Sequence, residues 1–374
     1  MCSILQLWPL PEQGSLHGAE QLMANPVRVK AGYTRAIDFK HGCVEMKHGS
    51  GGRAMAQLIQ QLFVAAFDNE FLRQSNDQAC FQGSNERMVM STDSYVITPL
   101  FFPGGDIGSL AVHGTINDIA MSGATPSYLA ASFILEEGFA LSDLKRIVDS
   151  MAQSAMAAGV PIVTGDTKVV ERGSADGVFI TTTGIGKIAE GINISGENAR
   201  PGDKILVSGL LGDHGIAVMA LRENLSFQTS IQSDTAALHD LVANMVAAVP
   251  TIHVLRDPTR GGVATVLNEI AQQSAVGMML YESKLPMRAQ VNAACEFLGL
   301  DPLYIANEGK LIAICGADDA ENLLNAMHKH ALGKDAAIIG EVIEDTHCFV
   351  QMQTRFGGSR VVDWLSGEQL PRIC

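Results

Sequence analysis

Apolar residues recur along the chain at two spacings, one typical of helices and one of strands. Helical spacing predicts a helix that begins near Arg53 and a second that runs from a cap at Asp106 to about Ser122. A third begins at Ser142 and is stopped by Gly159. The strands predicted in this part of the chain are residues 87–91, 128–135, 160–164 and 178–188.

The pattern restarts after residues 196–203, where an Arg-Pro-Gly sequence marks a domain boundary. Beyond it, strands and helices again alternate, which predicts an α/β (α+β) fold of two domains. We expect an extension at 1–45 that is poorly ordered or reflects a start codon assigned too early, an N-terminal domain at 46–196, a C-terminal α/β domain at 197–355 and a mobile tail at 356–374. The further elements predicted are strands at 204–208, 277–281, 311–315 and 336–341, and helices at 235–248, after Gly261-Gly262, and at 321–331.

Composition narrows the class of protein. The chain has 374 residues, 47% apolar and 18% charged, which is enough apolar material for two packed cores. Its net charge of −14 argues against nucleic-acid binding, because that function leaves a basic footprint. No apolar run is long enough to span a membrane and no secretory signal is evident, so we expect a cytoplasmic protein. The seven cysteines are scattered without a CxxC pair, which favours neither disulfides nor zinc.

A glycine-rich segment directly precedes the first predicted helix. It consists of His48, Gly49, Ser50, Gly51 and Gly52. Backbone N–H groups at such a loop, with a helix start behind them, suit a phosphate group. An ordinary flexible turn explains the loop equally well. Gly261-Gly262, with arginines nearby, resembles a second phosphate loop.

Acidic residues form a second set of candidates. Asp93 ends a predicted strand, Asp166 follows another, and Asn117-Asp118 lies inside a largely apolar helix. A buried carboxylate such as Asp118 is costly unless it is paired or binds metal. Hard oxygen ligands without a His/Cys cluster fit Mg²⁺ bound to phosphate, so we consider Asp93, Asp118 and Asp166 as metal ligands. Caps or salt bridges are the alternative for each.

Two further polar residues and the terminal thiol complete the set of candidate site residues. Lys168 could neutralise charge on a phosphate, and Glu308 could act as a general base, although each could be an ordinary loop residue. Cys374 ends a tail that could span about 33 Å from Trp364. The adjacent Arg372 would favour its thiolate. An incidental tail cysteine is the alternative.

Taken together, these residues resemble the HypE family, the carbamoyl dehydratases of [NiFe]-hydrogenase maturation. The similarity covers about residues 47–374 and rests on the order of its motifs. These motifs are HGSGG, STDSYV, PLFFPGGDIG, GTINDIA, FILEEG, GDTKVVERG, LGDHG, RDPTRGGV, NEGKL, HALGKDAAIIGEV and the final PRIC.

The resemblance implies a two-domain fold like that of aminoimidazole ribonucleotide synthetase. It also implies a homodimer that pairs the N-terminal sheets, with ATP and Mg²⁺ at that interface. It assigns His48–Gly52, Asp93, Asn117, Asp118 and Asp166 to Mg-ATP, Lys168 and Glu308 to the reacting group, and Cys374 to the carrier thiol.

The implied reaction loads a carbamoyl group onto Cys374 from a HypF-type carbamoyltransferase and dehydrates it with ATP to a thiocyanate. The cyano group then passes to a HypC–HypD complex, with no nucleic acid or membrane involved. A selenophosphate synthetase or thiamine-monophosphate kinase would leave the PRIC ending unexplained. A non-catalytic scaffold that presents its tail to partners is the alternative of another class.

Overall fold

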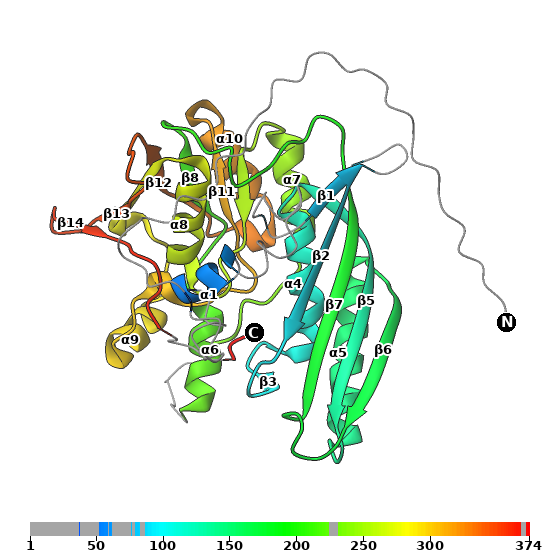
Figure 1. The fold of residues 1–374 in the computed structure, drawn as a ribbon. Helices are drawn as coiled ribbons and strands as arrows, with labels where there is room; N and C mark the ends of the chain where they lie inside the picture. Colours follow the sequence, from blue (N-terminus) through cyan, green and yellow to red (C-terminus); the bar gives the residue numbers. More distant parts are fainter. Residues whose placement is uncertain are drawn as a thin grey trace.

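The computed structural model describes residues 37, 52–58, 60–61, 76, 79–82, 87–223, 231–367 and 372–374. Two sheets, each with helices packed on it, make up these residues (Figure 1). Most of the predicted extension at 1–45 and the loop residues His48–Gly51 lie outside them. Helix α1 follows that loop as Arg53–Leu58.

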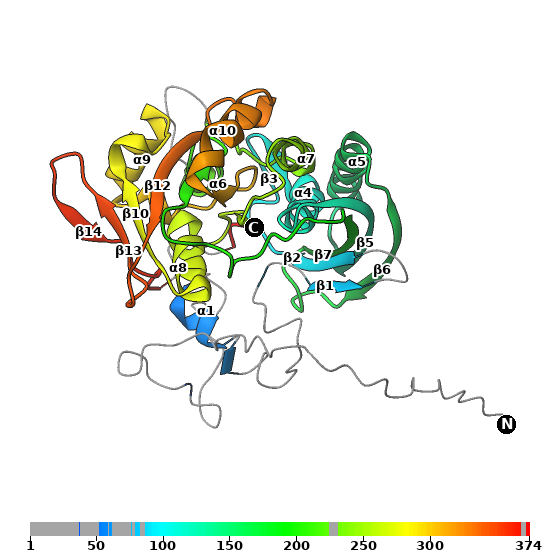
Figure 2. The ribbon, with the colours of Figure 1, turned by 90° about the horizontal axis from the view of Figure 1, so that it is seen from above.

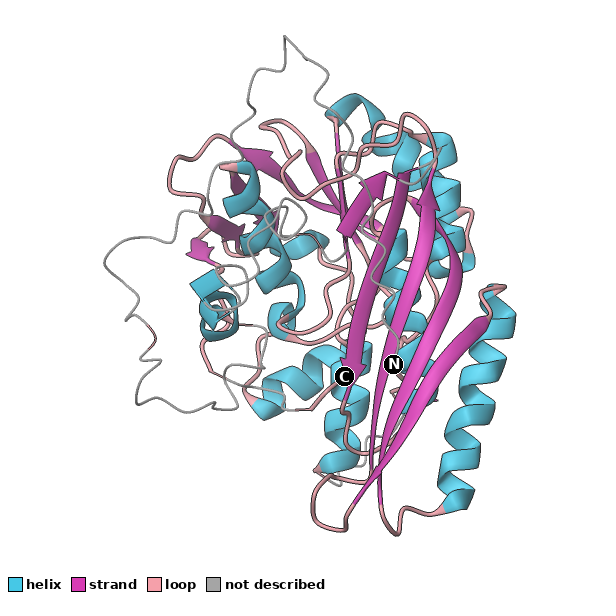
Figure 3. Cartoon of the chain, turned by 45° about the vertical axis from the view of Figure 1, so that its right-hand side comes forward, coloured by secondary structure: helices cyan, strands magenta, loops and turns pink. Residues whose placement is uncertain are grey.

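The first sheet has the strand order β1-β2-β7-β5-β6. Only β5 and β6 pair in parallel, and α5 makes the crossover between them, as a parallel connection requires. Helices α4 and α5 lie on one face, and no described helix covers the other face (Figure 3). The elements are β1 Ala79–Gln82, β2 Arg87–Tyr95, α4 Ile107–Ala120, β5 Ala124–Glu136, α5 Leu141–Ala158, β6 Ile162–Val170 and β7 Val178–Ile188, with a small hairpin of β3 Phe101–Phe102 and β4 Gly105–Asp106.

Helix α4 is the central element of this half. It is buried on nearly every side, as expected for a helix that is apolar all round. The predicted cap is confirmed, since the Asp106 carboxylate accepts the N–H groups of Gly108 and Ser109. Such a cap contributes about 1 kcal/mol. Gly159 ends α5 in the left-handed conformation, also as predicted.

The second sheet has the order β14-β13-β10-β12-β8-β11-β9. One face packs on α7 and α10, and the other packs on α8. Strand β14 follows the boundary predicted at residue 355 yet belongs to this sheet. The elements are β8 Lys204–Val207, α6 Asp213–Arg222, α7 His239–Ala248, β9 Val254–Arg256, α8 Gly262–Ser274, β10 Gly277–Tyr281, α9 Ala289–Leu298, β11 Ile312–Cys315, α10 Ala320–His328, β12 Ala337–Ile343, β13 Val350–Gln353 and β14 Ser359–Val361.

A continuous apolar core joins the two halves. Ile119 of α4 and Leu241 of α7 belong to the same buried cluster as Leu206 and Leu323 of the second half. The halves therefore meet through α4, α7 and α10, which fixes the position of one sheet's helices against the other (Figure 2). Within the described residues, the longest helices are too short or too polar to cross a membrane.

Candidate active site

The last residues of the chain are docked between the two halves, where the C terminus lies close to α4, α6 and α8 (Figure 2). The Val96 N–H donates to the Cys374 carbonyl at 3.3 Å, and the Thr98 N–H donates to the Arg372 carbonyl at 3.2 Å. These bonds have the antiparallel pattern of an added strand. Ile373 is buried in the core of the first half. Residues 372–374, the described end of the tail that was predicted to be mobile, are thus packed between the two halves. We call the side chains that surround Cys374 the cleft.

The Cys374 side chain lies in a charged environment. Burial is the main reason that the pKa of its thiol is raised far above the usual value. Arg260 opposes this increase, whereas Glu308 and Asp93 reinforce it. The cation that acts on the thiol is therefore Arg260. Arg372 was expected to do so, but its guanidinium instead contacts the Val96 carbonyl and Asp176.

Glu308 is the most unusual carboxyl group of the cleft. Its side chain is 2% exposed, and burial, reinforced by Asp234, Asp257 and Asp93, raises its pKa well above the usual value. Among the described residues, its Oε1 atom has no hydrogen-bond partner. The nearest imidazole nitrogen, Nε2 of His214, is 4.0 Å away. A buried carboxyl group left unpaired in this way is costly and marks a functional site.

The backbone of Glu308 is held from two sides. The Asp234 carboxylate accepts its N–H at 3.1 Å, and Nδ2 of Asn117 donates to its carbonyl at 3.1 Å. Asn117 also bonds the Ala236 carbonyl and the Leu238 N–H. The Asn117 side chain thus joins α4 to the second half, and this bonding differs from the nucleotide contact that the resemblance assigns to it.

The loop before α8 closes another side of the cleft. Gly261 and Gly262 both have positive φ angles, and a Cβ atom on Gly262 would lie 2.5 Å from the Leu303 carbonyl oxygen. Nδ2 of Asn307 donates to the Pro258 carbonyl at 3.1 Å. This bond ties the loop to the segment that carries Glu308, and Arg260 is thereby placed beside the tail.

Asp93 and Asp118 lie on the same side of the cleft. Ser91 donates its hydroxyl to Asp118 at 2.7 Å, and Asp93 is two residues further along β2, so both side chains of this strand face α4. Asp93 and Asp118 both raise the pKa of the buried Tyr95 hydroxyl, although burial is the larger cause. Asp93 also acts electrostatically on Glu308 and Cys374, so the structure brings this predicted residue together with both, and Asp118 is bonded to the same face of β2.

Asp166 and Lys168 lie elsewhere. Both are on β6 rather than in a loop after it, because β6 stays paired with β5 as far as Val170. Asp166 is in register with Ser132 of β5, Thr181 of β7 and Ser94 of β2. The side chains of these residues lie on the face of the sheet away from α4. Its carboxylate pairs with Lys168 at 2.7 Å, and both side chains are exposed.

This placement separates Asp166 from the other aspartates. Two strands, β7 and β5, lie between β2 and β6, a span of about 14 Å. One Mg²⁺ ion binds oxygens within about 4 Å of each other, so within one chain Asp166 cannot share an ion with Asp93. Among the described residues, no three His, Cys, Asp or Glu side chains are grouped as a metal site.

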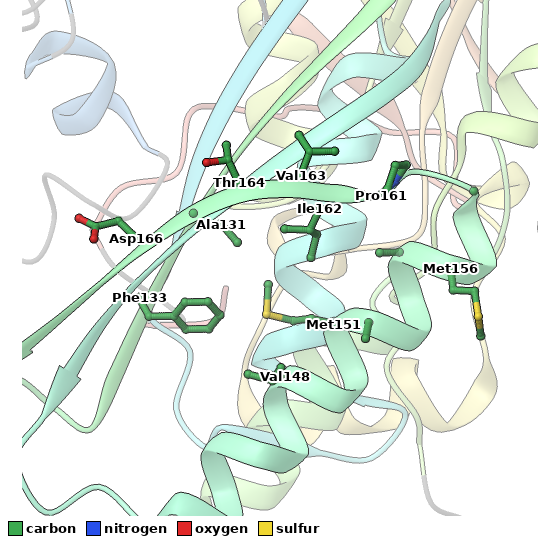
Figure 4. Close-up of a pocket in the computed structure, with 14 residues that line it drawn as sticks. Ala131, Phe133, Val148, Met151, Met156, Pro161, Ile162, Val163, Thr164 and Asp166 are labelled. Carbon is green, nitrogen blue, oxygen red and sulfur yellow. The ribbon is translucent and has the colours of Figure 1, made fainter.

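A pocket opens beside Asp166, between β6 and α5. Its lining is mainly apolar, with Met151 and Val148 on the helix and Ile162 on the strand, and Asp166 lies at its edge (Figure 4). None of the residues around Cys374 lines this pocket. The pocket and the cleft that holds the tail are therefore separate features.

Three residues of the cleft were not predicted as site residues. His214 donates to the tail, Asp234 holds Glu308, and Arg260 faces the thiol. His214 lies in the LGDHG motif and Arg260 in RDPTRGGV, so the sequence indicated both segments but not these two residues as site residues. Asp234 has no motif around it, and only the fold places it beside Glu308.

Comparisons with known proteins agree with one another. The family models of the N-terminal and C-terminal domains of AIR synthase related proteins match residues 75–188 and 200–353. The carbamoyl dehydratase HypE of Cupriavidus necator is 69% identical over 92% of this chain and 99% of its own length.

Two crystal structures are also similar. One is a HypE–HypF complex, whose matching chain is 53% identical with a TM-score of 0.79, over 82% of this chain and 99% of that chain. The other is HypE in complex with ATP, 50% identical with a TM-score of 0.75, over 89% of this chain and 100% of that chain. The two AIR synthase related domains, the terminal cysteine in the cleft and these similarities show that the chain belongs to the HypE family of carbamoyl dehydratases.

Proposed function

We propose that this chain uses ATP to dehydrate a carbamoyl group on the Sγ atom of Cys374, giving a thiocyanate that supplies cyanide ligands to hydrogenase iron. The observation that carries the proposal is the seating of the tail against His214, whose Nε2 atom lies 2.9 Å from the Ile373 carbonyl oxygen and 4.0 Å from the Glu308 carboxyl group. Arg260 and Asp93 act electrostatically on the thiol of the next residue, Cys374. A thiol that is influenced by a buried carboxyl group, one of whose oxygens accepts no hydrogen bond from a described residue, is an arrangement for chemistry on the cysteine itself.

The buried cleft suits a loaded cysteine better than a free one. Cys374 is half-buried, and the burial of its thiol penalises the thiolate, which is the form that attacks an acyl donor. A sulfur that already carries a carbamoyl group has no charge to desolvate. We therefore place loading outside the cleft, where the thiolate is accessible, and dehydration inside it.

Dehydration requires that a poor leaving group be activated. The carbamoyl oxygen attacks the γ-phosphorus of ATP, ADP leaves, and one N–H proton is lost. Glu308 then takes the second N–H proton while the C–O bond breaks and phosphate departs, leaving Cys374–S–C≡N. Glu308 can take this proton only in its ionised form, which the raised pKa disfavours. Arg260, which acts electrostatically on the Cys374 thiol, would stabilise the negative charge that builds up on the reacting group.

The acidic residues fit a magnesium nucleotide. Asp93 and Asp118 offer hard oxygens on one wall of the cleft, which is the donor type that Mg²⁺ prefers. When bound, Mg²⁺ would neutralise charge on the transferred phosphoryl group. Asp166 and Lys168 can join this site only from a second copy of the chain. We therefore propose a homodimer in which the interface is the face of the first sheet that no described helix covers, with His48–Gly52 as a phosphate loop.

The partners follow from the same reaction. A carbamoyltransferase of the HypF type would load Cys374, in line with the HypE–HypF complex to which this chain is similar. A HypC–HypD complex would accept the cyano group, and the cytoplasm is the compartment we propose. A phosphotransferase like selenophosphate synthetase or a non-catalytic scaffold would have no use for a thiol seated beside an unpaired glutamate.

ATP turnover tests the proposal. The wild-type chain, once carbamoylated, should release one phosphate for each loaded cysteine, and the unloaded chain should release little. The Cys374→Ala variant, treated in the same way, should show no stimulated release. Stimulated phosphate release from Cys374→Ala would mean that the cysteine is not the carrier.

A further inference from the structure

His214 makes a buried contact with the docked tail. It is the second residue of α6, and its side chain is completely buried. Its Nε2 atom lies 2.9 Å from the carbonyl oxygen of Ile373, the residue directly before Cys374. Its Nδ1 atom lies 2.7 Å from the Ser233 hydroxyl. The Phe102 ring meets the imidazole edge to face at 5.4 Å.

These contacts fix the protonation of the ring. A carbonyl oxygen only accepts, so Nε2 must carry the proton that is donated to Ile373. Burial lowers the pKa of His214, so the ring is neutral and Nδ1 accepts from the Ser233 hydroxyl. Ser233 and Phe102 therefore hold the imidazole with its donor pointing at the tail.

We infer that His214 is the positioning residue that keeps the tail docked, through the bond from its Nε2–H to the carbonyl of Ile373. The docking of the tail by His214 does not depend on the proposed function; only its effect on dehydration rests on that function. The other side-chain contacts of the tail are less buried. Arg222 donates to the Arg372 carbonyl and Arg372 donates to the Val96 carbonyl, both in part-buried positions, and Asp176, which pairs with Arg372, is 67% exposed. Exposed pairs contribute little, whereas a buried donor that loses its acceptor is costly.

The same segment also reaches Glu308. Ser233, which orients His214, is followed directly by Asp234, which holds the Glu308 backbone. The Lys310 ammonium pairs with Asp234 at 3.1 Å and anchors it. Seating of the tail and placement of Glu308 therefore depend on neighbouring residues of one segment. Loss of the His214 bond should lower kcat for dehydration and leave KM for ATP unchanged.

Alkylation of Cys374 tests the docking directly and needs no enzymatic turnover. The full-length, unloaded chain is treated with iodoacetamide, and modification of the C-terminal peptide is followed by mass spectrometry. Removal of one buried hydrogen bond in His214→Ala should raise the rate at Cys374 about three- to tenfold. His214→Gln, whose amide can donate from a similar position, should restore part of the protection. Ser233→Ala, which keeps the ring but frees its orientation, should give an intermediate rate.

His328→Ala is the matched control, because it removes a histidine contact to a backbone carbonyl far from the tail, that of Ala336 at 3.0 Å. It should leave the rate at Cys374 unchanged. If His214→Ala does not fold, the Ser233→Ala rate decides the question. Rates equal to wild type in the folded variants overturn the inference. Faster alkylation in a chain that never forms a cyano group would instead overturn the proposed function and leave the inference standing.

Discussion

At the scale of single residues, the cleft is organised around a carboxyl group whose surroundings raise its pKa. Glu308 is buried among Asp234, Asp257 and Asp93, and each of them adds to the cost of ionising it. Arg260 offsets part of that cost. Such an environment raises the basicity of a carboxylate, which is what the removal of a weakly acidic N–H proton requires.

This environment predicts a pH dependence. A base with a raised pKa is active only when deprotonated, so dehydration should slow as pH falls and should accelerate as pH rises through the pKa of Glu308. The loaded Cys374 carries no titrating thiol, so it adds nothing to this profile. Single-turnover rates of the carbamoylated chain across pH measure it. A rate that increases toward acid would contradict the role of Glu308.

The Glu308→Gln variant should keep the shape of the cleft and lose the base. We expect the rate to fall by about 10²- to 10⁴-fold, the usual contribution of a general base, with ATP binding retained. Binding measured by calorimetry and turnover measured by phosphate release separate the two effects. Full turnover by this variant would remove Glu308 from the mechanism.

At the scale of elements, the segment from Asn307 to Lys310 shows why the chain needs a glycine beside its base. A Cβ atom on Gly309 would lie 1.8 Å from the Asp234 carbonyl oxygen, so the two backbones can approach only at a glycine. The adjacent Asp234 carboxylate holds the Glu308 N–H. The NEGKL motif thus encodes a close backbone contact as well as a carboxyl group.

We therefore expect Gly309→Ala to be strongly destabilising, by at least about 2 kcal/mol in the free energy of unfolding. Gly316→Ala is the control, because a Cβ atom added there would meet no other atom within 4 Å. Denaturant unfolding of both variants makes the comparison. Equal stability of the two would show that the segments can move apart freely.

Most of the helices and strands could be predicted from the sequence. The predicted strand at 178–188 and helix cap at Asp106 are confirmed because alternation and capping are local signals. The strand predicted at 160–164 was too short, since pairing with β5 extends it through the polar residues Asp166 and Lys168. Asp234 was missed because its role depends on a contact 74 residues away in sequence. Local patterns carry no information about such contacts.

At the scale of the whole molecule, the candidate residues are divided between two surfaces. Asp93, Glu308 and Cys374 share the cleft, and Asp118 is bonded to Ser91 on the same face of β2, whereas Asp166 and Lys168 lie on the far side of the first sheet. A single chain therefore holds only part of the predicted magnesium site. Two-fold pairing of identical chains would supply the remainder from a second copy.

Subunit complementation tests this arrangement. In a mixed dimer of Asp93→Asn and Asp166→Asn, one of the two shared sites would be intact, so co-expression should recover about a quarter of wild-type activity. Asp93→Asn mixed with Asp118→Asn is the control, because both changes fall in the same half-site and no intact site can form. Inactivity of the first mixture, with dimers present, would contradict a shared site.

The central claim is that chemistry takes place on Cys374, and mass spectrometry of the C-terminal peptide tests it most directly. The chain is carbamoylated by a HypF-type transferase with isotopically labelled carbamoyl phosphate and then given ATP and Mg²⁺. We predict that the C-terminal peptide loses one water from its carbamoyl adduct and retains the labelled carbon as a cyano group on Cys374. A labelled cyano group on the Cys374→Ala chain, or a carbamoyl adduct on Cys374 that persists with ATP, would contradict the account.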